Sequence, residues 1–193
     1  MLANKYYEEY IMKKLLCLIL ALSLVLGMSL MLVSCSSDDE EKEAEEKKEI
    51  IDFNGMEFEI PEGYTLIAED AVNASYVNMS TGSTLTIAVQ KTIYDKDYEY
   101  KGPLYDNEAD FIADFVNAGA NVDISDVKID HGVGSQVITY SMTVGGVKMY
   151  MSMTVGVLRN TVMDDGVEKY EYTTYTVAIT STEPGVGSAG FIK

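Results

Sequence analysis

The sequence predicts an α+β fold in which an antiparallel β-sheet meander packs against one amphipathic helix, as a two-layer sandwich. Apolar and polar residues alternate through several segments, which is the pattern of half-buried strands. Glycine-containing dipeptides separate these segments and favour tight hairpin turns. A single segment places its apolar residues at helical spacing. We expect this fold over residues 50–193, preceded by a signal helix and an acidic linker.

The chain begins with features of an export signal. Residues 15–33 are almost wholly apolar and follow Lys13 and Lys14, which supplies the charged and apolar regions of a signal peptide. We therefore predict a signal peptide over residues 1–34, with Met12 as an alternative start. The apolar run is also long enough to be a retained transmembrane helix. In both cases the lysines stay inside and the domain faces outside the cytoplasm.

The end of the apolar run carries a recognisable motif. Leu32-Val33-Ser34-Cys35 resembles the lipobox of bacterial lipoproteins. The resemblance implies that the leader is cut before Cys35 and that its thiol carries a diacylglyceryl group. Cys35 would then anchor the domain at the cell membrane. Membrane lipid, bound through Cys35, is therefore an expected partner. Acyl chains contribute about 0.8 kcal/mol for each buried CH2.

An acidic linker follows over residues 35–49, with the sequence SSDDEEKEAEEKKE after the cysteine. It has no apolar face to bury, so we interpret it as a solvated spacer. The whole chain has a formal net charge of −17. A protein that tracks a nucleic-acid backbone needs positive charge, so nucleic acid is excluded as a partner.

Strands are predicted wherever apolar side chains alternate with polar ones. The strongest patterns begin at Met56, Leu85, Ile138 and Val147, and a looser one runs from Tyr175 to Ile179. We expect one face of each strand to be buried and the other to be wet, with the second half forming a long meander. Three dipeptides predict hairpins between these runs: Asn54-Gly55, Gly145-Gly146 and Asp165-Gly166.

One helix is predicted over residues 106–119. Asp106 or Asn107 can cap its first turn and Gly119 can end it. Its apolar stripe consists of Phe111, Ile112, Phe115 and Val116.

The order of these elements and the segment FEIPEGY, residues 58–64, distantly resemble the PsbP-like and DcrB-like domains of exported bacterial lipoproteins. Those domains share a scaffold rather than a catalytic set. The resemblance therefore implies a fold and transfers no catalytic, cofactor or metal site.

Several residue patterns could carry chemistry, and each has a simpler interpretation. The methionines Met142, Met149, Met151 and Met153 could bind Cu(I) through their thioethers, but their register with valines favours a role in the core. Asp95, Asp97, Glu99 and Asp106 faintly imitate a calcium loop, and Asp164, Asp165 and Glu168 form a second acidic group. In the first group, Tyr100 stands where a calcium loop needs glycine. The second group flanks the glycine of a predicted hairpin. We therefore interpret both groups as solvated surface residues.

The usual catalytic signatures are missing from the sequence. His131 is the only histidine, so a zinc site with two or three histidine ligands cannot be assembled. Gly185–Gly190 matches GxGxxG, but too few residues follow for a nucleotide fold. Arg159, the only arginine, could bind an anion but is expected in an exposed loop. We therefore predict no catalytic residue and no cofactor.

Tyrosine is the last unusual feature, with 14 residues in a chain that has no tryptophan. Exposed tyrosines stack on sugars or anchor protein interfaces, whereas strand tyrosines fill positions that suit their β-propensity. The sequence thus favours a membrane-anchored binding or interaction module with a protein or glycan partner at the cell surface. An exported hydrolase with an unrecognised carboxylate site is the alternative, and a metal-handling lipoprotein is a weaker one.

Overall fold

The computed structural model describes residues 49–100, 102–117 and 123–185. The signal peptide, Cys35 and nearly all of the acidic linker lie outside these residues. Within the described part, no helix is long and apolar enough to cross a membrane. The described elements are, in chain order, β1 (Glu49–Phe53), β2 (Met56–Ile60), β3 (Tyr64–Glu69), β4 (Asn73–Asn78), β5 (Ser83–Tyr94), α2 (Glu108–Asn117), β6 (Asp123–His131), β7 (Ser135–Val144), β8 (Val147–Asp164) and β9 (Val167–Ser181).

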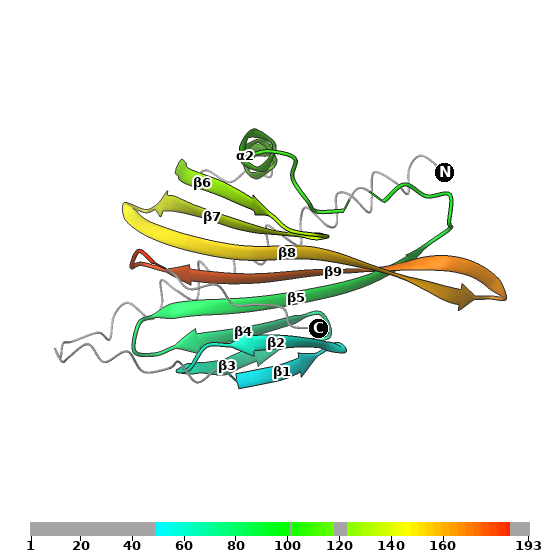
Figure 1. Ribbon diagram of the computed structural model, residues 1–193. Coiled ribbons are helices and arrows are strands. Elements are labelled where there is room, and N and C mark those ends of the chain that lie inside the picture. The colour runs from blue at the N-terminus through cyan, green and yellow to red at the C-terminus, as the bar shows by residue number, and fades with distance from the viewer. Residues whose placement is uncertain (1–48, 101, 118–122, 186–193) are drawn as a thin grey trace.

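Seven of the strands form one antiparallel sheet in the order β3-β4-β5-β9-β8-β7-β6 (Figure 1). Strands β6 to β9 follow one another as the predicted meander. Strand β9 then pairs with β5 and joins the two halves of the sheet. The predicted class, an antiparallel sheet with a single helix, is confirmed for the described residues.

All three predicted hairpins are confirmed. Asn54-Gly55, Gly145-Gly146 and Asp165-Gly166 each join two strands whose flanking residues pair directly. Both residues of every dipeptide have positive φ, between 50° and 85°. This is the backbone conformation that two-residue hairpins of right-twisted strands require, and glycine adopts it without a steric cost.

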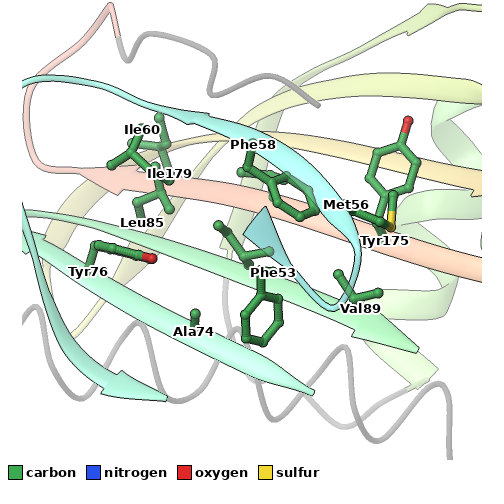
Figure 2. Packing of buried hydrophobic residues seen from close by; sticks show 12 residues of the cluster. Phe53, Met56, Phe58, Ile60, Ala74, Tyr76, Leu85, Val89, Tyr175 and Ile179 are labelled. Carbon is green, nitrogen blue, oxygen red and sulfur yellow. The ribbon is translucent and has the colours of Figure 1, made fainter. Parts of the chain in front are cut away.

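The β1–β2 hairpin corrects the prediction of a two-layer sandwich. It forms a separate two-stranded sheet rather than part of the meander. Its apolar face lies over β4, β5 and β9, where Phe58 is fully buried and packs edge-on against Tyr175 (Figure 2). A two-stranded hairpin is marginal alone, so it needs this packing to be stable. The sheet therefore has a covering layer that the sequence patterns did not reveal.

Helix α2 covers the opposite face of the sheet. Ala178 in β9 belongs to the cluster around α2, whereas its neighbours Val177 and Ile179 belong to the cluster under the hairpin. Successive side chains of a strand point to opposite faces. The hairpin and the helix thus cover different halves of the sheet on different sides, with β9 contributing to both clusters.

The described helix, Glu108–Asn117, buries a narrower stripe than predicted. Asn107 caps it, because its Oδ1 accepts a hydrogen bond from the backbone N–H of Asp110 at 3.0 Å. Phe111 and Phe115 are buried, but Ile112 and Val116 are 36% and 62% exposed. The helix lies over the β6 side of the sheet, so only one row of its side chains meets the cluster. The predicted end at Gly119 lies outside the described residues.

The prediction of one buried and one wet face fails for β5. Leu85 and Ile87 are buried as expected, but Thr84 and Thr86 on the other face are also buried. Strand β5 lies inside the sheet between β4 and β9, so neighbouring side chains flank its threonines on both sides.

Candidate functional site

Strands β8 and β9 extend beyond the rest of the sheet as a projecting ribbon. Strand β7 pairs with β8 only as far as Gly156, and the β8–β9 ladder continues from there to the turn at Asp165-Gly166. We call residues 157–174 the arm. Strand β5 stays paired with the β9 side of the arm as far as Tyr94 opposite Tyr170, and only the tip beyond this pair reaches past all other strands (Figure 1). No arm residue belongs to either hydrophobic cluster.

Five tyrosines, the tyrosine cluster, gather where the arm leaves the sheet. Strand β5 supplies one, β9 supplies two, and the crossover segment after β5 supplies two. They are Tyr94, Tyr98, Tyr100, Tyr170 and Tyr172. In β5 and β9 they are placed by register, because Tyr94 lies directly opposite Tyr170. Residues far apart in the sequence thereby form one aromatic cluster, in which Tyr172 is buried and the other four tyrosines are half-buried.

The rings of the cluster pack against one another in defined geometries. Tyr98 stacks on Tyr94 with a centroid distance of 4.1 Å and an interplanar angle of 9°. Tyr100 lies over Tyr172 at 4.3 Å. Such pairs stabilise by about 0.5–1.5 kcal/mol beyond the area they bury. The crossover segment is therefore held on the sheet by its own tyrosines.

Two cations lie over the ring of Tyr170. The guanidinium carbon of Arg159 is 4.7 Å from the ring centroid and Nζ of Lys96 is 5.5 Å from it. The prediction of an exposed loop at Arg159 is wrong in part, because Arg159 is exposed but lies in strand β8. Lys96 also pairs with Glu168, and this hydrogen bond raises the pKa of its ammonium. The cluster is thus edged by fixed positive charge.

The two acidic groups of the sequence meet at Lys169. Its Nζ lies 2.7 Å from Asp164 and 3.8 Å from Asp95. The hydrogen bond to Asp164 is the largest of the effects that raise the pKa of Lys169. Among the described residues, no group of three or more His, Cys, Asp or Glu is placed to hold a metal ion. The carboxylates here are arranged around an ammonium group.

Tyr100 has the most perturbed hydroxyl of the cluster. Burial raises its pKa to about 12, although a hydrogen bond with Thr174 opposes the shift. Burial disfavours the charged phenolate, so this hydroxyl stays protonated and remains a hydrogen-bond donor at neutral pH. Tyr100 therefore contributes a neutral phenol to the site.

The far end of the crossover segment is fixed by Gln136, which the sequence analysis missed. Its buried side chain accepts a hydrogen bond from the N–H of Tyr105 at 2.9 Å and donates one to the carbonyl of the same residue at 2.5 Å. His131, at the exposed end of β6, places Nδ1 3.0 Å from Nε2 of Gln136. The alternation pattern could have identified Gln136 as a buried polar residue, because it falls in register with the buried Ile138 and Tyr140.

The methionines of the copper hypothesis all lie in the cluster beneath α2. Their exposure is 1–2%, and they pack with Ile138, Val155 and the helix phenylalanines. The four are Met142, Met149, Met151 and Met153. This placement is what the core interpretation predicts, because flexible thioethers fill the space under the helix.

Two of the candidate site features, Cys35 and the part of the GxGxxG segment after Gly185, also lie outside the described residues. No protein-family model matches the sequence, and no curated protein matches it. The site therefore has to be interpreted from its own geometry.

Proposed function

We propose that this chain is an exported lipoprotein, anchored to the cell membrane through Cys35, whose folded domain is a binding module. The observation that carries the proposal is the tyrosine cluster at the base of a projecting arm. Tyrosines combine a large apolar ring with a polar hydroxyl, which suits them to recognition. In this proposal the acidic linker keeps the domain clear of the anionic membrane.

The chemistry of the surface favours a protein or glycan partner. Stacked rings present flat apolar area that sugar C–H groups or apolar side chains can cover. Arg159, Lys96 and the carboxylates beside them add hydrogen-bonding groups of both signs at the edge. The surrounding elements already order these side chains, so a partner would lose little conformational entropy on binding them.

The anchor is tested by expressing the full chain in a bacterial host and measuring the mass of its N-terminal peptide. We expect the peptide to start at Cys35 and to carry acyl chains. Cys35→Ser should remain unacylated and unprocessed. A wild-type protein that keeps residues 1–34 and bears no lipid would contradict the proposed anchor.

The binding surface is tested with the full chain in membranes, probed with purified envelope polysaccharides and envelope proteins. We expect Tyr98→Ala and Tyr170→Ala to weaken binding at least tenfold. Tyr150→Ala is the matched control, because Tyr150 also carries a cation over its ring, Lys148 at 5.3 Å, but lies outside the cluster. Equal binding by all three variants would rule out the tyrosine cluster as the contact surface.

A further inference from the structure

The arm leaves one edge of β8 without a strand partner among the described residues. Pairing with β7 ends where Ser135 lies opposite Gly156. One more backbone hydrogen bond follows, from the N–H of Val157 to the carbonyl of Gly134 at 2.9 Å. Beyond it, residues 158–164 pair only with β9.

This edge lacks the devices that protect the other edges of the sheet. The outermost strands β3 and β6 are each interrupted by a bulge, at Leu66/Ala68 and at Ser125/Lys128. The β8–β9 ladder runs without a shift to the end of the arm. Leu158 is 38% exposed and Met163 69% exposed along it. Regular, unprotected edges are the ones that accept another strand.

The direction of the backbone groups on this edge follows from the hydrogen bond of Val157. In antiparallel strands, alternate residues direct both N–H and C=O to the same side. Because the N–H of Val157 faces the β7 side, so do the backbone groups of Arg159, Thr161 and Met163. Thr161 is the midpoint of the open interval 158–164.

We propose that two copies of this chain pair antiparallel along this edge, with Thr161 on the two-fold axis. In this register Thr161 lies opposite Thr161 of the second copy, and Arg159 lies opposite Met163 of the second copy. All three outward-facing residues are paired, which gives about six backbone hydrogen bonds. The paired segment of each copy ends beside Val157 of the other copy, whose N–H is already bonded to the carbonyl of Gly134. The arrangement is isologous, as two-fold dimers require.

Side chains across the junction are compatible. Thr161 would form a cross-strand threonine pair, a favourable combination on a sheet surface. Arg159 would lie beside Met163 of the second copy, whose other neighbour in the sheet is Glu168. Arg159 and Glu168 of the second copy, which also pairs with Lys96, would therefore lie in the same row of the sheet, two strands apart, at both ends of the junction, and no like charges would face each other directly. The charge pattern favours this register and thereby a second copy as the occupant.

The test is oxidative cross-linking of Thr161→Cys in the full chain, purified in detergent. Directly opposed residues in a hydrogen-bonded antiparallel pair have Cα atoms about 5.5 Å apart, which fits a disulfide. We expect a disulfide-linked dimer several-fold above the wild-type background from the native cysteines. Met79→Cys is the matched control, because it is 71% exposed but lies in the turn between β4 and β5.

A second variant separates edge pairing from chance collision. Met163→Pro removes an N–H that faces the open edge and leaves the β9 side of the ladder intact, so the strand should persist. Added to Thr161→Cys, it should return cross-linking to background while circular dichroism stays unchanged. Arg159→Glu should also lower the yield, and Glu168→Lys should restore it. Cross-linking that survives Met163→Pro, or that Met79→Cys equals, overturns the proposal.

Discussion

Strands β8 and β9 pass through two very different environments. Between Met149 and Gly156, β8 is almost fully buried and helps to form the cluster under α2. In the arm the same strand is mostly exposed, although its pairing with β9 is unchanged. Backbone pairing thus continues where burial stops. Burial is determined by the elements that cover each face of the sheet, and the arm extends beyond both.

This difference predicts that the body of the sheet and the arm contribute unequally to folding stability. Buried apolar side chains each contribute about 1.5–3 kcal/mol, so the body of the sheet supplies most of the folding free energy. Exposed side chains on the arm can vary or bind with little cost to the fold. The variants below test that division.

The largest effect is expected for Phe58→Ala in the body. Phe58 is fully buried between the hairpin and the sheet, so its loss should lower the free energy of unfolding by about 3–5 kcal/mol. Met163→Ala on the arm should change it by less than about 0.5 kcal/mol. Urea denaturation followed by circular dichroism measures both. Similar losses for the two variants would contradict the division between body and arm.

The boundary between the two regions is tested by Gly156→Val. A Cβ at this position would lie 2.2 Å from the ring of Tyr175, which covers the glycine. We expect a loss of about 1–3 kcal/mol from overpacking. Adding Tyr175→Ala should make the combined loss smaller than the sum of the single losses, because the clash is removed. If the two losses of stability were strictly additive, the position of the Tyr175 ring would not depend on the absence of a side chain at Gly156.

Gln136→Leu tests the attachment of the crossover segment to the body. The variant keeps much of the side-chain volume but loses both hydrogen bonds between Gln136 and the backbone of Tyr105. We expect a loss of about 1–3 kcal/mol. Hydrogen exchange should rise at Tyr105 and in the first turn of α2, with β4 as an internal reference. Unchanged exchange at Tyr105 would show that Gln136 is dispensable for this attachment.

The smallest effect concerns alkaline pH and the tyrosine cluster. The folded pKa of Tyr100, about 12, exceeds its ordinary value of 10.0 because of burial. Its contribution to stability is therefore fully present below pH 10 and is lost as the pH rises towards 12. Burial also raises the pKa of Tyr76 and of Tyr175, and phenolate absorbance should show a latest-titrating group that Tyr100→Phe removes. If the latest-titrating group remained in Tyr100→Phe, that group would belong to another tyrosine.

Local patterns predicted the local structure well. Three hairpins followed from positive-φ dipeptides, and the helix followed from Phe111 and Phe115 with the cap at Asn107. Alternation also identified the methionines as core residues. These features depend on neighbouring residues, so the sequence carries them directly.

Features that depend on distant contacts were not predictable in the same way. The β1–β2 hairpin has the same alternation as the main strands, so its separate packing over the sheet was hidden. The tyrosine cluster joins residues from 94 to 172, and only the β5–β9 pairing brings them together. The role of Gln136 was partly predictable, because a polar residue at a buried position of a strand needs a hydrogen-bond partner. The anchor at Cys35 stays a prediction.

The separate hairpin also has a mechanical consequence. Glu49 and Ile60 are paired at the open end of the β1–β2 ladder, so a pull on the chain ahead of Glu49 loads that ladder as a zipper. Its hydrogen bonds would break one after another, whereas the main sheet, which shares no ladder with β1, would lose none of its own hydrogen bonds in this step. Tension from the N-terminal side would therefore peel the first strand and leave the body intact. The hairpin is therefore the element that we expect to open first under such a pull.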